Sequence, residues 1–432
     1  MRIVQFTPGT GSFYCGSCLR DNTLVRALRR QGHDATLVPL YLPHLADETS
    51  AATGSPLFFG GINVYLQQQS ALFRHTPTWL DRWLDSPRLL RFAAARASMT
   101  DAADHGAMTL SMLRGEEGRQ AKELAKVLAW LRQPDHRPDV LSLSNGLLIG
   151  LARRIRAELQ IPVVATLQGE DVFLDGLTPP FNTDAWALMR NRARDVSRFI
   201  AVSQAYGRTM AGRLGWPTGK IAVVPNGIDL DGFDCATELP PPTIGFLARL
   251  SPAKGLDRLV DAFILLRAQG RCPDVRLRLA GAQTGADLPF VQRLQARIAA
   301  AGLAREVDFL PNLERHAKQD FLRSLTVLSV PTAGEAFGLY VLEALACGVP
   351  VVQPADGAFP ELIAATNGGV LYDPNRANAL ADALAALLHD PRRRDELGRA
   401  GRQAVREKFT ADHMARAFAA VCAEAIQQPS AP

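Results

Sequence analysis

The sequence lacks several features that would place it in other protein classes. It has no apolar run approaching 18 residues, so it offers no candidate transmembrane helix. No GxGxxG fingerprint follows a predicted strand, and no GxxxxGK precedes a Ser or Thr. These absences argue against a dinucleotide redox cofactor and against a P-loop. Zinc-finger, homeodomain and RNP-type patterns are also missing, so we expect no nucleic-acid partner.

Cysteine is scarce, and only Cys15 and Cys18 form a close pair among six cysteines. One CxxC without a second pair does not make a structural zinc site. The pair falls where a helix should begin after the first strand, a setting that suits either redox-active thiols or small packing residues. The eight histidines show no paired metal-ligand spacing. We therefore expect neither a metal nor a cofactor.

Composition describes an enzyme-sized globular protein. The 432 residues suggest about two domains, and 47% are hydrophobic while 21% are charged. The net charge of +5 is spread over the chain, which favours an anionic small ligand or an anionic surface. The N-terminus enters a short strand directly, without the regions of a signal peptide. We expect a cytoplasmic protein.

Short apolar strands alternate with amphipathic helices through most of the chain. The strands predicted before the proline run 239–242 are 3–7, 35–39, 140–143, 163–167, 199–202 and 221–224. Those predicted after it are 243–247, 275–280, 307–310, 326–330, 349–353 and 370–372. This alternation predicts an α/β protein with two Rossmann-like, doubly wound parallel sheets facing a cleft. In such folds ligands bind at the carboxyl ends of the strands.

These patterns divide the chain into three parts. Residues 1–238 form the predicted N-terminal domain, residues 239–410 the C-terminal domain, and residues 411–432 a helix that packs back on the first domain. A helical insertion covers about 41–133 and includes one candidate strand at 63–66. Within it, 76–97 is basic and amphipathic, which suits either a peripheral membrane contact or a helical lid.

The stretch 330–350, VPTAGEAFGLYVLEALACGVP, holds two carboxylates eight residues apart. We expect a strand end, a glycine-bearing loop and a helix that begins near Phe337 and stops at Gly348. The free N–H groups of a helix start attract phosphate, and Glu343 inside the apolar run would grip another part of the ligand. Alternatively, Glu335 and Glu343 only decorate an ordinary core helix.

Other loops after strands could converge on the same ligand. Arg249 and Lys254 lie five residues apart in a strand-to-helix loop, where Arg offers a bidentate fork and Lys a point charge for phosphate. The turns 311–312 and 356–357 follow other strands of the same sheet. The alternative is that both cations are solvated surface groups.

Taken together, these motifs resemble a known family. GEAFGLYVLEALACGVPVV matches the Glu-x7-Glu motif of retaining glycosyltransferases of the GT-B fold, family four. ARLSPAKG resembles the phosphate-binding segment of that family, GAFPELI its loop before the last strands, and the 199–229 stretch the end of its N-terminal domain. The resemblance covers most of the chain apart from 41–133.

The resemblance implies transfer of a sugar from a nucleotide-diphosphate sugar to an acceptor, with retention of the anomeric configuration and without an obligatory metal. Glu335, Arg249 and Lys254 would be catalytic. The residues expected to bind the sugar donor are Glu343, Phe337, Gly338, Leu339, Gly11 and Ser12. Arg249 and Lys254 would neutralise the departing diphosphate. A carboxylate at Glu343 among apolar neighbours would be costly alone, so a ribose diol is a sensible partner for it.

The chain departs from the family where the N-terminal domain often has a histidine, because it reads TLQGEDVF with Gln168. Glutamine cannot act as a general base, so either the phosphate of the sugar donor takes the acceptor proton or another group does. Glu170 and Asp171 are the nearest candidates. We expect Gln168, Glu170, Asp171 and Asn22 to line the acceptor site.

The acceptor itself is open, and a glycan, a lipid-linked sugar or a small molecule would each fit. Two rival functions remain from the sequence. One is a nucleotide-sugar epimerase of the same fold, which would need no acceptor. The other is a thiol redox or sensing protein centred on Cys15 and Cys18.

Overall fold

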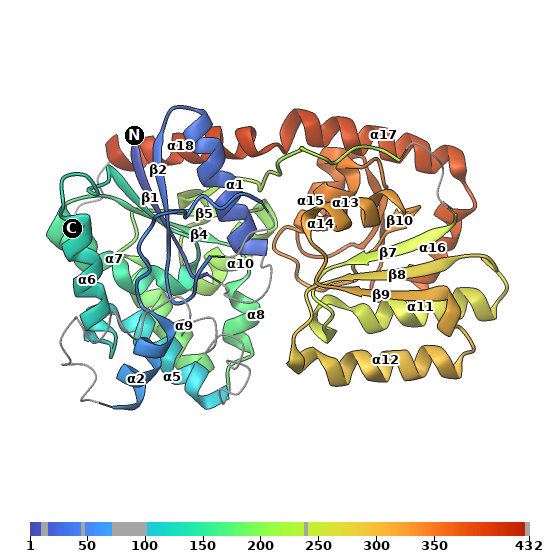
Figure 1. Cartoon of the computed structure of the whole chain (residues 1–432), viewed down its shortest axis with the longest axis horizontal. Coiled ribbons are helices and arrows are strands. Elements are labelled where there is room, and N and C mark those ends of the chain that lie inside the picture. The colour runs from blue at the N-terminus through green and yellow to red at the C-terminus, as the bar shows by residue number, and fades with distance from the viewer. Residues whose placement is uncertain (10–15, 45–47, 71–101, 237–240, 428–432) are drawn as a thin grey trace. The chain divides into compact units, whose positions relative to one another are not determined.

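The computed structural model describes residues 1–9, 16–44, 48–70, 102–236 and 241–427. Contacts group the chain into an N-terminal unit, Met1–Pro225 with Ala411–Pro432, and a C-terminal unit, Asn226–Thr410. Each unit contains one six-stranded sheet surrounded by helices (Figure 1). This confirms the predicted α/β fold with two doubly wound sheets. The proline run taken as the boundary begins in residues outside those described.

The strands of the N-terminal unit are all parallel and follow the order β2-β1-β3-β4-β5-β6. Strands β3 and β4 are buried along their whole length, as expected of continuous apolar runs covered on both faces. The strands are β1 (Arg2–Thr7), β2 (Asp34–Pro39), β3 (Val140–Leu143), β4 (Val163–Leu167), β5 (Arg198–Ala201) and β6 (Ile221–Val223).

Nine α-helices accompany this sheet among the described residues: α1 (Gly16–Arg30), α2 (Gly61–Gln69), α5 (Ala102–Arg114), α6 (Ala121–Leu131), α7 (Ala152–Leu159), α8 (Glu170–Asp175), α9 (Phe181–Ala193), α10 (Gln204–Leu214) and α18 (Ala411–Gln427).

The predicted strand at 63–66 was wrong, because these residues lie inside α2. The run of Ile, Val and Tyr favours a strand locally, but burial follows the helical period, with Val64 and Gln68 both buried. Gln67 donates from Nε2 to Glu123 Oε1 of α6 at 2.8 Å. Packing of α2 on its own unit therefore overrides the local strand preference.

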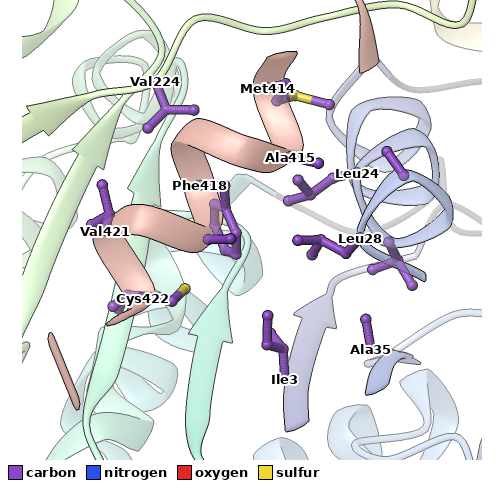
Figure 2. Close-up of a cluster of buried hydrophobic side chains, with 14 of the residues drawn as sticks. Ile3, Leu24, Leu28, Ala35, Val224, Met414, Ala415, Phe418, Val421 and Cys422 are labelled. Atoms are coloured by element: carbon purple, nitrogen blue, oxygen red, sulfur yellow. The ribbon is translucent and has the colours of Figure 1, made fainter. Parts of the chain in front are cut away.

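Helix α18 completes the core of the N-terminal unit. Its buried Phe418 lies with Leu24 and Leu28 of α1 in one hydrophobic cluster (Figure 2). At the rim of this contact, Arg30 of α1 pairs with Asp412 at 2.8 Å. The apolar positions of α18 recur every three to four residues, which gives the helix one continuous buried face.

The C-terminal unit has the parallel strand order β12-β11-β10-β7-β8-β9. Its strands are β7 (Thr243–Leu247), β8 (Arg276–Gly281), β9 (Val307–Pro311), β10 (Val327–Leu328), β11 (Val351–Pro354) and β12 (Gly369–Tyr372). Its helices are α11 (Leu256–Ala268), α12 (Leu288–Ala300), α13 (Arg315–Arg323), α14 (Leu339–Ala346), α15 (Phe359–Thr366), α16 (Ala379–Leu388) and α17 (Pro391–Lys408). Helices α11 and α12 cover one face of the sheet, and α14 and α15 cover the other (Figure 1).

Each sheet reverses its winding once, between β1 and β3 in the N-terminal unit and between β7 and β10 in the C-terminal unit. At such a switch point the loops leave neighbouring strands toward opposite faces, and ligands of open α/β sheets bind there. In the C-terminal unit, the strand order therefore predicts a ligand site at the loops after β7 and β10.

Candidate active site

The loop after β7 carries Arg249 and Lys254, and the loop after β10 carries Glu335. The two loops touch closely at Gly255, which has φ 69°, a conformation that favours glycine. A Cβ at Gly255 would lie only 2.1 Å from the carbonyl oxygen of Pro331. The glycine is therefore required for the approach of one loop to the other.

Glu335 lies at the centre of this junction, with its side chain 12% exposed. Lys254 donates from Nζ to Glu335 Oε2 at 2.6 Å. The hydroxyl of Tyr340 donates to the same oxygen at 2.8 Å. Two residues of the predicted catalytic set, Lys254 and Glu335, are thus in direct contact.

The backbone of the Glu335 loop is bound to the turn after β11. Ala358 donates its N–H to the carbonyl oxygen of Glu335 at 2.9 Å. Gly334 donates its N–H to Asp356 Oδ2 at 2.8 Å. Gly357 has φ 57°, and a Cβ there would lie 2.6 Å from the same Glu335 oxygen. The turn at 356–357 therefore supports the Glu335 loop from behind.

Helix α14 begins at Leu339, two residues later than predicted, and Gly338 precedes it with φ 92°. The first N–H groups of such a helix have no partner within the helix and carry the positive end of its dipole. The ring of Phe337 is 5% exposed and lies 6.5 Å from that of Phe409. The ring of Phe337 is therefore packed inside its own unit, and the prediction that Phe337 binds the sugar donor concerns its backbone N–H.

Glu343 does not lie alone among apolar side chains. Lys318 of α13 donates from Nζ to Glu343 Oε1 at 2.7 Å, and the two side chains are 11% and 15% exposed. The protein thus supplies a cation for this carboxylate, so burial of Glu343 does not by itself require a ligand diol, and its contact with a ribose stays a prediction. Glu343 lies on α14 about one and a half turns beyond Gly338.

Arg249 points to a different partner from Lys254. Its guanidinium contacts both oxygens of Asp287, with Nε 3.1 and 3.2 Å away. Burial alone would raise the pKa of Asp287, but hydrogen bonds from Thr284 and Arg249 hold that pKa below its usual value. Asp287 is 6% exposed, so an ionised carboxylate fixes the position of Arg249, which is itself 46% exposed.

Three of the residues expected at the acceptor gather at the end of β4. Glu170 is 4% exposed and accepts from the N–H groups of Gly146 and Gln168 at 2.8 and 2.9 Å. Tyr206 donates its hydroxyl to Glu170 and contacts Asp171 as well, each at 2.9 Å. Burial raises the pKa of the Glu170 carboxyl, although these hydrogen bonds act to lower it. Glu170 holds the loop together, whereas Asp171 and Gln168 are partly exposed.

Asn22 and Cys18 lie in helix α1 of the N-terminal unit. Asn22 is fully buried in α1, where its side chain binds the backbone of Thr49 and Ala51. Cys18 is buried as well, and Thr7 Oγ1 donates to its sulfur at 3.7 Å. Gly11, Ser12 and Cys15 lie outside the described residues, as does the basic stretch 76–97.

The sequence did not predict three side chains that hold predicted site residues in place: Tyr340, Asp287 and Lys318. Tyr340 follows Glu335 by five residues in the same motif, so its proximity had a local signal. Asp287 and Lys318 come from segments 38 and 25 residues away from Arg249 and Glu343. Only the packing of α13 and of the loop after β8 reveals them.

Within the described part of the chain, no three His, Cys, Asp or Glu side chains gather closely enough to hold a metal ion. None of the described helices has the length and apolar content needed to cross a bilayer.

Comparison with known families places both halves of the chain. Residues 234–404 match the family described as glycosyl transferases group 1. Residues 95–231 match glycosyltransferase family 4. A D-inositol 3-phosphate glycosyltransferase of Jonesia denitrificans is 33% identical over 47% of this chain and 51% of its own length. A lipopolysaccharide core biosynthesis mannosyltransferase, LpsB of Rhizobium meliloti, is 33% identical over 52% and 66%. The chain thus spans about half to two thirds of these relatives.

Solved structures support the same fold. Sucrose-phosphate synthase from Thermosynechococcus elongatus superposes with a TM-score of 0.72 at 19% identity, covering 100% of both chains. Anabaena HepE in complex with UDP superposes with a TM-score of 0.70 at 19% identity, covering 98% of this chain and 100% of its own. At this identity the likeness establishes the fold, and the chemistry is argued from the side chains.

Proposed function

Because the chain belongs to the group 1 glycosyltransferases of family four, with the GT-B fold, we propose that it moves a sugar from a nucleotide-diphosphate sugar to a hydroxyl acceptor with retention of configuration. The observation that carries this proposal is the contact of Lys254 with Glu335 at the β7–β10 switch point. It joins a cation suited to phosphate with a carboxylate suited to sugar hydroxyls.

The two cations supply the electrostatic part of the reaction. The bond between the sugar and the diphosphate breaks in the transition state, and negative charge collects on the departing phosphate. Arg249 and Lys254 stabilise that charge, and the N–H groups of Gly338 and Leu339 at the start of α14 add to it. Because two cations neutralise the diphosphate, we expect transfer to proceed without an obligatory metal, which activity in excess EDTA would test.

The carboxylates orient the substrate. We assign Glu335 to the hydroxyls of the transferred sugar and Glu343 to those of the ribose. Each carboxylate accepts a hydrogen bond from a lysine, at 2.6 Å for Glu335 and 2.7 Å for Glu343. A ligand must therefore share or displace those ammonium groups, and Lys254 is well placed to pass from Glu335 to the diphosphate.

Deprotonation of the acceptor is assigned to the phosphate of the sugar donor. Gln168 cannot accept a proton at neutral pH. Its side chain donates to the backbone oxygen of Ser144, which fixes its amide. Glu170 is occupied by backbone N–H groups and by Tyr206. The partly exposed Asp171 is then the carboxylate we assign to acceptor hydroxyls.

We infer a carbohydrate or lipid-linked acceptor, because one relative is named for lipopolysaccharide core biosynthesis and another for an inositol phosphate. We place the reaction in the cytoplasm, with a peripheral membrane contact through 76–97. Co-sedimentation with vesicles of anionic lipid at low salt tests that contact, and its absence would remove it.

A thermal-shift screen with UDP-, GDP- and ADP-sugars is the first test. A ligand at a hundred times its Kd stabilises the native state by about 2.7 kcal/mol, which a melting curve resolves easily. The donor found in this way is then used to compare Glu343→Ala and Arg249→Ala with the wild type. We expect weaker nucleotide binding in the first variant and slower transfer in the second.

Arg276→Ala is a matched control for Arg249→Ala. Arg276 lies in the same unit, is 44% exposed and faces Asp308, much as Arg249 is 46% exposed and faces Asp287. If Arg249→Ala and Glu343→Ala both behaved like this control, the site assignment would be wrong. The anomeric configuration of the first product, observed by NMR during turnover, distinguishes retention from inversion.

A further inference from the structure

The two oxygens of Glu335 have different surroundings. Lys254 Nζ and Tyr340 OH both donate to Oε2, at 2.6 and 2.8 Å. No residue in the described part of the chain donates to Oε1. The side chain is 12% exposed, so one oxygen is held by the protein and the other can still accept hydrogen bonds from a ligand.

We propose that Tyr340 is a positioning residue for sugar transfer, which holds Glu335 Oε2 so that Oε1 receives the hydroxyls of the transferred sugar. The inference rests on the proposed function and adds to it a residue outside the predicted catalytic set. Tyr340 lies in the first turn of α14, directly after the loop that carries Glu335.

The tyrosine is suited to this because its proton stays in place. Tyr340 is 9% exposed. Burial, and next the charge of Glu335, raise the pKa of its hydroxyl well above the usual value. The hydroxyl therefore remains a neutral hydrogen-bond donor through the whole working range of pH.

Lys254 cannot serve the same purpose during turnover. Its ammonium is the mobile partner of Glu335, since an incoming diphosphate competes for it. When Lys254 turns to the phosphate, Tyr340 still holds Oε2. The backbone bonds from Ala358 and Gly334 fix the loop but leave the side-chain torsions of Glu335 free. Tyr340 is thus the contact that keeps the carboxylate oriented at the moment of transfer.

Tyr340→Phe tests this by removing a single oxygen. A lost hydrogen bond to a charged group changes a rate or an affinity by about ten- to a hundredfold. We expect kcat to fall by that factor. The ratio of the Kd for a nucleotide sugar to the Kd for its nucleoside diphosphate should rise, while the Kd for the diphosphate stays the same. The probes are UDP with UDP-glucose and GDP with GDP-mannose, measured by calorimetry.

Tyr372→Phe is the matched control, because Tyr372 is also 9% exposed and lies in the same unit at the end of β12. It should change neither kcat nor the ratio. Suppose that the wild type binds a nucleotide sugar and its nucleoside diphosphate with different affinities, and that Tyr340→Phe behaves like Tyr372→Phe. That result would overturn this inference and leave the proposed function standing. A wild type that binds none of the four probes, and gives no shift with ADP-glucose, would overturn the proposed function and this inference with it.

A second variant separates positioning from simple packing. In a Glu335→Ala background the carboxylate is gone, so adding Tyr340→Phe should leave the binding ratio unchanged. If Tyr340→Phe still raised the ratio by tenfold in that background, the tyrosine would act through some other contact, and the inference would be wrong.

Discussion

The ion pair between Lys318 and Glu343 allows a quantitative prediction, because it joins two helices through one nearly buried contact. The Nζ–Oε1 distance is 2.7 Å, and the side chains are 11% and 15% exposed. Lys318→Met keeps most of the side-chain volume and removes the charge. The variant leaves the Glu343 carboxylate with little water and without this cation.

The expected cost follows from that burial. Exposed pairs contribute about 0–1 kcal/mol. Hydrogen bonds to charged groups contribute about 1.5–3 kcal/mol to stability. A buried partner that is left unpaired destabilises the fold further, because its desolvation is no longer compensated. We expect Lys318→Met to lower the free energy of unfolding of the C-terminal unit by about 2–3 kcal/mol, which lowers its Tm by about 5–10 °C. Adding Glu343→Gln should restore about 2 kcal/mol of this loss.

The assay must report on the C-terminal unit. All five tryptophans lie before residue 217, so fluorescence follows the N-terminal unit only. Scanning calorimetry or hydrogen exchange in α14 follows the relevant unit, with Lys408→Met at the exposed end of α17 as the control. A coupling energy under about 0.5 kcal/mol in the double-mutant cycle would mean that the pair does not hold α13 to α14, and the reasoning would fail.

Three further predictions use other parts of the molecule. The pKa of Asp287 is lowered in the folded protein, so its ionised carboxylate stabilises the fold above the unfolded pKa near 4, and this stability is lost as the pH falls through the folded pKa. The free energy of unfolding, measured with urea at pH 7 and pH 3, should therefore change less in Asp287→Asn than in the wild type. Gly255→Ala places a Cβ 2.1 Å from a backbone oxygen, whereas Gly270→Ala, at similar φ, meets nothing within 4 Å. The first should therefore abolish transfer and lower Tm well beyond the second. Phe418→Ala should cost the N-terminal unit about 3–5 kcal/mol in urea unfolding followed by tryptophan fluorescence.

The sequence predicted the sheets well because their strands are short, apolar and bounded by loop residues. Strands β3, β4 and β7 were predicted to the residue. The prediction failed at α2, where a strand-favouring run lies in a helix whose Gln67 hydrogen-bonds to Glu123 of α6. Local preference decides such a segment only when no neighbouring element competes.

Among the contacts of the site, those between residues on separately packed elements could not be predicted from the sequence. The sequence motifs predicted that Lys254 and Glu335 would meet at one ligand, and they do lie together because each follows one of two strands that are adjacent in the sheet. It could not show that Lys318 reaches Glu343, because that contact depends on how α13 packs against α14. Side chains that meet through packing leave no periodic trace in one sequence.

The order of the chain has a consequence for its synthesis. The core of the N-terminal unit is closed by α18, the last described helix, while the C-terminal unit is made of one continuous segment, Asn226–Thr410. On the ribosome, the later-made unit can therefore finish folding before the earlier one. The emerging first half must keep the surface around Leu24 and Leu28 uncovered for as long as it takes to translate about 200 more residues, roughly 10–40 s at ordinary elongation rates. During that interval this apolar surface has no partner from α18, and the nascent N-terminal unit is exposed to aggregation.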